Sequence, residues 1–157
     1  SIILGQTWKN INEIELVLCS SLTRTLETTE NIFSNINVKK IALDVLKEYP
    51  QGDQMVNKRS NKSLLIEKFK TIDFSYLDSE EDEMWQKYNL KGEETIDDLN
   101  QRINIINEFI KQRPEETIAI VGHNSFIGQY KDKKIGLIEN GDEELLHCHP
   151  YKCDFKL

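Results

Sequence analysis

The chain has 157 residues, of which 38% are hydrophobic and 30% are charged, a balance that excludes a disordered protein and suits one domain with a sizeable core. Its formal net charge of −7 argues against a surface for nucleic acid or anionic membranes. No apolar run reaches the roughly 18 residues of a transmembrane helix, and no signal peptide opens the chain. Three cysteines at irregular spacing predict reduced thiols and a cytoplasmic protein.

The first strand and helix are predicted between residues 15 and 33. Residues 15–19 form a short apolar strand candidate, and the pattern from 22 to 33 then turns helical, with apolar positions three and four apart. Either Ser20 or Ser21 is a candidate N-cap for this helix.

Arg24 therefore falls in the first turn of a helix that follows a strand. The free N–H groups and dipole of a helix N-terminus favour anions, and a guanidinium binds two phosphate oxygens at once. An alternative interpretation remains open, in which Arg24 is an exposed helical arginine paired with Glu27 or Glu30.

A second strand is predicted at residues 41–43, and the Pro50 to Gly52 region marks the loop after it. Glu48 is thus a carboxylate close to a strand end. A partly desolvated carboxyl in that position has a raised pKa and serves as a general acid, although an ordinary loop glutamate fits the position as well. The next segment, residues 53–62, contains Lys58, Arg59 and Lys62, and is either a solvated loop or a basic patch over an anion pocket.

The clearest helix begins at Thr95, which forms a capping-box pattern with Asp98, and it ends before Pro114. It leads to residues 117–121, whose nearly continuous apolar character predicts a strand buried on both faces. Gly122 and His123 follow at the carboxyl end of this strand, where open α/β sheets bind ligands. The alternative for His123 is a hydrogen-bonded histidine without a functional role.

A terminal hairpin is predicted from strands at residues 135–138 and 145–148. His147, Cys148, His149 and Cys153 match no common structural zinc spacing, so we expect neither a metal nor another cofactor.

Three motifs together resemble the histidine phosphatase superfamily, also called phosphoglycerate mutase-like. The segment Ser20-Ser21-Leu22-Thr23-Arg24-Thr25-Leu26-Glu27-Thr28 is similar to the family's Ser-Pro-Leu-x-Arg-Ala-x-x-Thr motif. Leu46-Lys47-Glu48 with Gly52 resembles its Leu-Arg-Glu…Gly segment, and Val121-Gly122-His123-Asn124-Ser125 resembles its late Val-Gly-His-Ser-Ser motif. Gly5 is similar to the glycine of its early Leu-Thr-x-x-Gly segment. The motifs agree in order and spacing over nearly the whole chain.

The resemblance implies a three-layer α/β/α sandwich with a mostly parallel sheet, formed by residues 1–157 as a single domain that is N-terminally incomplete. It also implies hydrolysis of phosphomonoesters through a phosphohistidine. By matching position, Glu48 is the general acid and His123 the second catalytic histidine, while Arg24 binds phosphate. Asn124 and Arg59 are further expected substrate contacts.

The family's nucleophile lies in an Arg-His-Gly motif, which does not occur in these residues. The histidines are His123, His147 and His149, and none of them follows an arginine. Three explanations stay open: a missing N-terminal segment, a genuine loss that leaves a pseudoenzyme, or a truncated copy of marginal stability. We expect a phosphatase rather than a mutase, because residues 53–94 contain no long basic insertion to hold a bisphosphate activator. The nucleophile of this phosphatase is absent from the chain. The alternative is a non-catalytic module that binds phosphate or a partner. The partner is a small phosphorylated substrate or phosphate, and the oligomeric state is not predicted.

Overall fold

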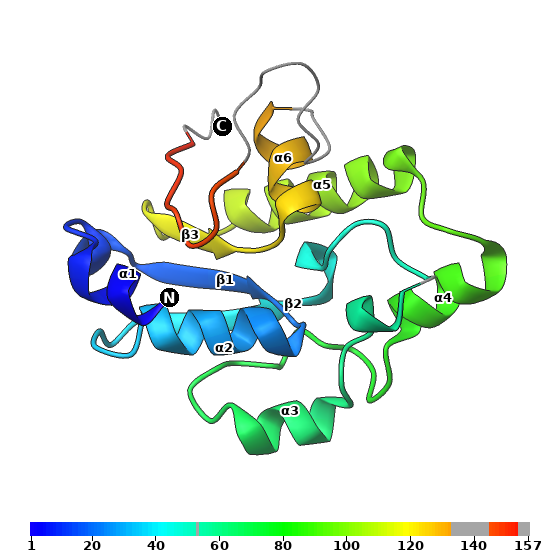
Figure 1. Ribbon diagram of the computed structural model, residues 1–157, viewed down its shortest axis with the longest axis horizontal. Helices are drawn as coiled ribbons and strands as arrows, with labels where there is room; N and C mark the ends of the chain where they lie inside the picture. Colours follow the sequence, from blue (N-terminus) through cyan, green and yellow to red (C-terminus); the bar gives the residue numbers. More distant parts are fainter. Residues whose placement is uncertain (53, 133–144, 154–157) are drawn as a thin grey trace.

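The computed structural model describes residues 1–52, 54–132 and 145–153. Its centre is a three-stranded parallel sheet in the order β2-β1-β3 (Figure 1). The strands are β1 (Leu16–Ser20), β2 (Lys39–Leu43) and β3 (Ile118–Val121). In this register Leu18 lies opposite Ile41 on one side and Ile120 on the other. The carboxyl ends of the strands consequently lie at the same edge of the sheet.

Six α-helices and three 3-10 turns accompany the sheet in the described part of the chain. The helices are α1 (Ile2–Thr7), α2 (Thr23–Ile32), α3 (Lys62–Lys68), α4 (Glu83–Lys91), α5 (Ile96–Lys111) and α6 (Asn124–Asp132). The turns are η1 (Ile11–Glu13), η2 (Asp44–Leu46) and η3 (Met55–Asn57). None of the described helices is long and apolar enough to cross a membrane.

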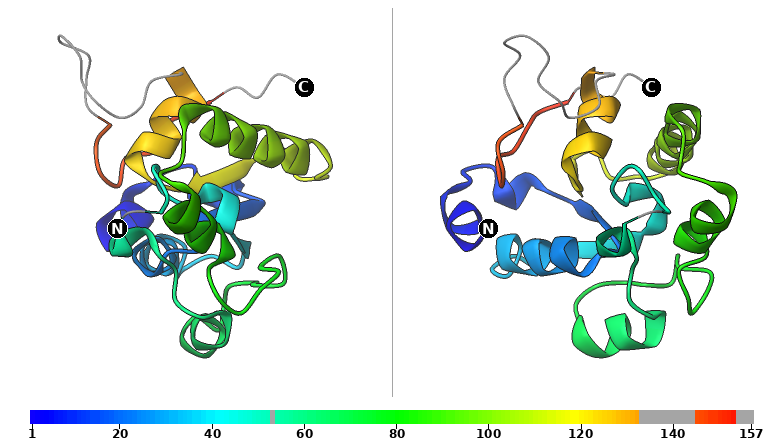
Figure 2. Two further views of the ribbon diagram at one scale, coloured as in Figure 1. Left: turned by 90° about the vertical axis from the view of Figure 1, so that its right-hand side faces the viewer. Right: turned by 45° about the vertical axis from the view of Figure 1, so that its right-hand side comes forward.

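The helices form one layer on each side of the sheet (Figure 2). Leu16 and Leu18 of β1 pack with Leu99 and Ile103 of α5 on one face. The alternate β1 residues point to the opposite face, where Cys19 packs with Leu26 of α2. Alternation along a fully buried strand thus produces the predicted α/β/α architecture with a parallel sheet.

Strand β3 is less buried than its sequence predicts. All five residues of β1 are buried, whereas every residue of β3 is only partly buried. β3 pairs with β1 along one edge and with no strand along the other among the described residues. The outer edge of β2, by contrast, is bonded to Asp73, and four of the five β2 residues are buried. The expectation that residues 117–121 are buried on both faces is therefore wrong.

The long helix α5 agrees with its prediction. Thr95 and Asp98 form the capping box, and Leu99, Ile103 and Ile106 are buried on one face. The predicted cap of α2 is wrong, since the N-cap residue is Leu22, without a side-chain cap. The two candidate caps have other partners: Ser21 donates to Asp44, and Ser20 lies beside His123.

Two glycines occupy places that a side chain would not fit. A Cβ at Gly5 would lie 2.3 Å from the carbonyl oxygen of Ile32, so Gly5 permits α1 to approach α2 closely. Gly52 has φ of +111°, and a Cβ there would lie 2.6 Å from the backbone of Tyr88. Glycine tolerates both the positive φ and the close approach.

The predicted terminal hairpin lies partly outside the described residues. Residues 135–138, its first strand, are outside them. Residues 145–148, its second strand, contain no strand and instead include a turn at 147–148. That half of the prediction is wrong; the Asn-Gly sequence that suggested the turn also lies outside the described residues.

Candidate functional site

The carboxyl ends of β1 and β3 bring together side chains that are far apart in sequence. His123 follows β3, and its Nε2 lies 2.8 Å from the Oγ of Ser20 at the end of β1. The same nitrogen lies 3.1 Å from the Oγ1 of Thr25 in the first turn of α2. His123 is only 7% exposed, so these hydroxyls satisfy a ring nitrogen that has little access to water.

His123 is a neutral imidazole at neutral pH. Burial, and to a smaller extent the positive charges of Arg24, Arg102 and Lys47, lower its pKa from the usual 6.5 to about 3. A bound anion would oppose the effect of these cations. Three cations therefore lie close enough to His123 to act on its pKa.

Arg24 lies in the first turn of α2, as predicted, and its side chain is exposed to solvent. Its Nη1 donates to the carbonyl oxygen of Val56 at 2.6 Å, and its Nη2 donates to the Oδ1 of Asn57 at 3.0 Å. The alternative pairing with Glu27 or Glu30 does not occur, because Glu27 accepts from Lys68 and Glu30 accepts from Thr71.

Asn57 is a residue that the sequence analysis missed. Its side chain is 3% exposed, and its Nδ2 donates to the carbonyl oxygen of Pro50 at 3.1 Å while its Oδ1 accepts from Arg24. Asn57 thus fixes the Arg24 guanidinium to the loop that follows Glu48. No spacing in the sequence indicated this contact, since 33 residues separate the two partners.

Glu48 lies at the N-terminus of α6. Its Oε1 accepts from the backbone N–H of Tyr49 at 2.8 Å and of Phe126 at 3.4 Å. Burial raises the pKa of the carboxyl, and these hydrogen bonds and the charge of Arg24 lower it in part. The net shift is upward, which is the direction that a general acid requires.

Arg102 is a second residue that the sequence analysis missed. It donates to both carboxylate oxygens of Glu94, at 2.6 and 2.9 Å, and both side chains are nearly inaccessible to solvent. It also donates to the carbonyl oxygen of Lys47 at 2.7 Å, and therefore fixes the backbone that carries Glu48. The sequence did contain one signal for Arg102, because it is a charged residue on the apolar face of α5, one turn from Leu99.

The segment 54–62 is not a basic patch over the pocket. Lys58 lies over the Trp85 ring, 4.9 Å from its centroid, and Lys62 donates to the carbonyl oxygen of Leu77 at 2.5 Å. Arg59 is 2% exposed; its Nε binds Asp44. The other Arg59 nitrogens donate to the carbonyl oxygens of residues 60, 79, 80 and 81. The structure thus places Arg59 within this loop network.

A buried ion pair lies beneath the same loop. Lys47 donates to both carboxylate oxygens of Asp82, at 2.5 and 2.6 Å, and neither side chain is accessible to solvent. Asp82 additionally accepts from the backbone N–H of Arg59 and of Trp85. This pair joins the segment before Glu48 to the start of α4.

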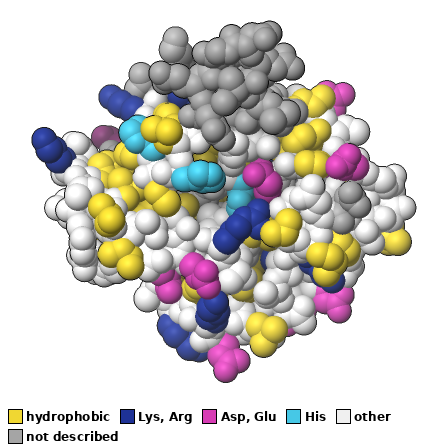
Figure 3. Space-filling model, in the orientation of Figure 1, with side chains coloured by type: hydrophobic (Ala, Val, Ile, Leu, Met, Phe, Trp, Pro, Cys, Tyr) yellow, Lys and Arg dark blue, Asp and Glu magenta, His cyan; other side chains and the backbone are white. Residues whose placement is uncertain are grey.

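The three predicted strand-end residues are near neighbours. The charge of Arg24 affects the pKa of both Glu48 and His123. Asn124, directly after His123, begins α6 and is partly buried. Figure 3 shows histidine, basic and acidic side chains gathered near the middle of this face.

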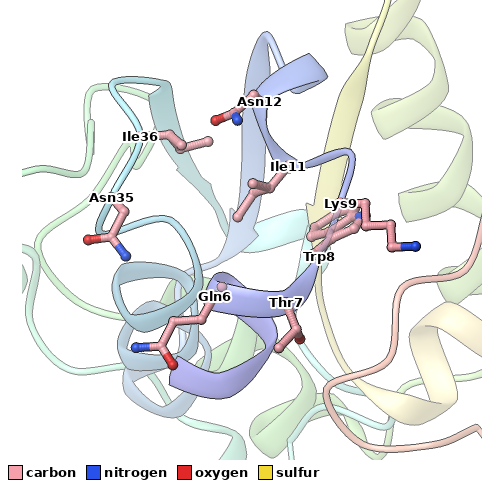
Figure 4. Close-up of a pocket in the computed structure, with 9 residues that line it drawn as sticks. Gln6, Thr7, Trp8, Lys9, Ile11, Asn12, Asn35 and Ile36 are labelled. Carbon is pink, nitrogen blue, oxygen red and sulfur yellow. The ribbon is translucent and has the colours of Figure 1, made fainter.

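A separate pocket of about 540 Å³ lies at the other end of the sheet, between the segment 5–12 and the turn after α2 (Figure 4). Its only charged lining residue is Lys9, whose side chain extends away from the other labelled side chains (Figure 4). It has no group suited to acid–base or phosphoryl chemistry beyond that lysine.

Comparisons with known proteins show the family of this chain. The family model described as histidine phosphatase superfamily (branch 1) matches residues 3–133, and the chain belongs to this superfamily. The chain is also similar to phosphoglycerate mutase-like protein 1 of Arabidopsis thaliana, with 28% identity over 142 residues. That match covers 73% of this chain and 49% of the relative, so the chain spans about half of the relative's length.

Proposed function

We propose that this chain provides the phosphate-binding and acid–base half of a phosphomonoesterase site. The observation that carries the proposal is the convergence of Arg24, Glu48 and His123 at the carboxyl edge of the sheet in a member of the histidine phosphatase superfamily. Arg24 would bind phosphate oxygens, with His123 and Asn124 completing the pocket. The substrate is a small phosphorylated molecule. All three cysteines are free thiols, which supports a cytoplasmic location.

The proposed reaction uses these groups together with a nucleophilic histidine. A nucleophilic histidine nitrogen attacks phosphorus, the bond to the leaving oxygen breaks, and a phosphohistidine forms. The protonated carboxyl of Glu48 transfers its proton to the leaving oxygen, so the alcohol departs neutral. Water then attacks phosphorus with Glu48 as base, which releases phosphate and restores the histidine. Arg24 and His123 stabilise the charge on the phosphoryl oxygens throughout.

The nucleophile is not one of the residues that we place in the site. A strand added beside β3, along the edge that pairs with no other described strand, would end next to His123. An Arg-His-Gly motif on such a strand would therefore reach the phosphate held by Arg24. The partial burial of four consecutive apolar residues in β3 supports this placement.

The test is phosphate release from an aryl phosphate at mildly acidic pH. We expect no turnover from the chain or from its His123→Ala variant, and turnover once the chain is joined to an upstream strand carrying Arg-His-Gly. Turnover by the chain itself that is lost in His123→Ala would contradict the absence of a nucleophile. Phosphate binding without turnover, even with the added strand, would favour the alternative function of a non-catalytic phosphate-binding module.

A further inference from the structure

The turn η3 and the residues around it form a rim beside Arg24. The contact is direct, since the carbonyl oxygen of Val56 accepts from the Arg24 guanidinium at 2.6 Å. The side chains of this turn are unusual for an exposed loop, because Met55 is 66% and Val56 is 63% exposed. Two large apolar side chains thus project into solvent next to Arg24, the residue predicted to bind phosphate. Hydrophobic side chains are visible beside the charged and histidine side chains of this face in Figure 3.

The cations of this rim do not extend the positive charge of the pocket. Lys58 packs on Trp85, and Arg59 is buried against Asp44. Lys58 is exposed as well, but Arg24 is the exposed rim cation whose charge acts on the pKa of both His123 and Glu48. Glu48 in turn influences the pKa of Arg24. A second negative charge on a ligand would meet apolar side chains and a carboxyl group in place of a cation.

We propose that this rim selects phosphomonoesters with one phosphate and an uncharged, apolar alcohol group. The inference rests on the proposed function and adds the substrate class. Arg24 holds the phosphate, while Met55 and Val56 cover the apolar group and remove it from water. Contact with two such side chains favours an apolar group by about tenfold in affinity. Substrates that carry a carboxylate or a second phosphate gain no affinity from contact with Met55 and Val56.

Binding to non-hydrolysable phosphonates tests the inference without requiring turnover. The probes are methylphosphonate, phenylphosphonate and phosphonoacetate, and their dissociation constants are measured by calorimetry with the full chain. We expect phenylphosphonate to bind about tenfold more tightly than methylphosphonate, and phosphonoacetate to bind no more tightly than methylphosphonate. In the double variant Met55→Ser/Val56→Ser the advantage of the phenyl group should disappear while methylphosphonate binding is unchanged. The contact between Val56 and Arg24 uses a backbone oxygen and survives the substitution.

Leu90→Ser is the matched control, because Leu90 is 84% exposed on α4, whereas the Arg24 guanidinium donates to Val56 and Asn57. It should retain the full preference for phenylphosphonate. Equal binding of phenyl- and methylphosphonate, or a preference that survives in the double variant, would overturn the inference while leaving the proposed function intact. Tightest binding of phosphonoacetate would also overturn it. If methylphosphonate does not bind, or binds Arg24→Gln equally well, the proposed function fails and the inference fails with it.

Discussion

His123 and Ser20 are 103 residues apart in sequence, yet the Nε2 of His123 lies 2.8 Å from the Oγ of Ser20. The pairing of β1 with β3 brings them together, since Cys19 lies opposite Val121 in the register. Ser20 is the last residue of β1, and His123 comes two residues after the end of β3. Burial of His123, rather than the charge of the nearby cations, is the main reason that its pKa is low.

The buried neutral state of His123 predicts a loss of stability in acid. The pKa is about 3 in the folded chain and near 6.5 when unfolded, so the unfolded state binds more protons between these values. Stability should therefore fall as pH decreases from 6.5 towards 3, with about 2 kcal/mol lost by pH 4.5 through this residue. Urea denaturation of the parent chain and of His123→Gln at pH 6.5 and 4.5 measures that contribution. His147→Gln, at an exposed histidine, is the control substitution.

Asn57 should act on phosphate binding through Arg24. We expect Asn57→Ala to weaken binding of inorganic phosphate by about fivefold to thirtyfold, because a lost hydrogen bond to a charged group costs roughly 1–2 kcal/mol. The decisive measurement is a double-mutant cycle with Arg24→Gln. If Asn57 positions Arg24, the double variant binds phosphate no more weakly than Arg24→Gln alone. Additive losses would show that Asn57 acts independently of Arg24.

The pair Arg102–Glu94 should be important for stability. Replacing Glu94 by Gln leaves the guanidinium buried beside a neutral group, and breaking a buried pair costs about 3–5 kcal/mol. The exposed pair Lys68–Glu27 is the matched control, and Glu27→Gln should cost less than about 1 kcal/mol. The free energy of unfolding is measured by chemical denaturation. Equal small losses in both variants would show that the buried pair contributes no more to stability than the exposed pair.

Glu48 predicts the opposite pH dependence from His123. Its pKa is raised in the folded chain, so its stabilising contribution is present below the unfolded pKa and is lost as pH rises through the folded pKa. Glu48→Gln should thus stabilise the chain more at pH 7 than at pH 4. Thermal unfolding at the two pH values tests this expectation. A difference that does not change with pH would show that ionisation of Glu48 has no energetic cost in the fold.

Much of the architecture could be predicted from local patterns. The period of apolar residues located α5, and the capping box at Thr95 and Asp98 located its start. The apolar runs located the three strands, and the rule that ligands lie at the carboxyl ends of parallel strands brought Arg24, Glu48 and His123 together. These features depend on residues that are close in sequence, or on one general rule of topology.

The errors arose where long-range contacts decide. Either Ser20 or Ser21 was expected to cap α2, but the Ser21 hydroxyl donates to Asp44 at the next strand end, and Ser20 lies beside His123. The cations of residues 58 to 62 were an open alternative for the pocket, but Trp85, Asp44 and Leu77 provide partners elsewhere. The burial of β3 depends on how many strands flank it, which the apolar character of the segment does not encode.

The most direct test of the central claim is the response of His123 to inorganic phosphate. Imidazole signals are followed by nuclear magnetic resonance during a phosphate titration of the full chain and of Arg24→Gln. The account predicts a saturable shift of the His123 signals and a rise in its pKa, because a bound anion offsets the nearby cations. Both effects should be much weaker in Arg24→Gln. Signals that do not move, or that move equally in the variant, would contradict a phosphate site formed by Arg24 and His123.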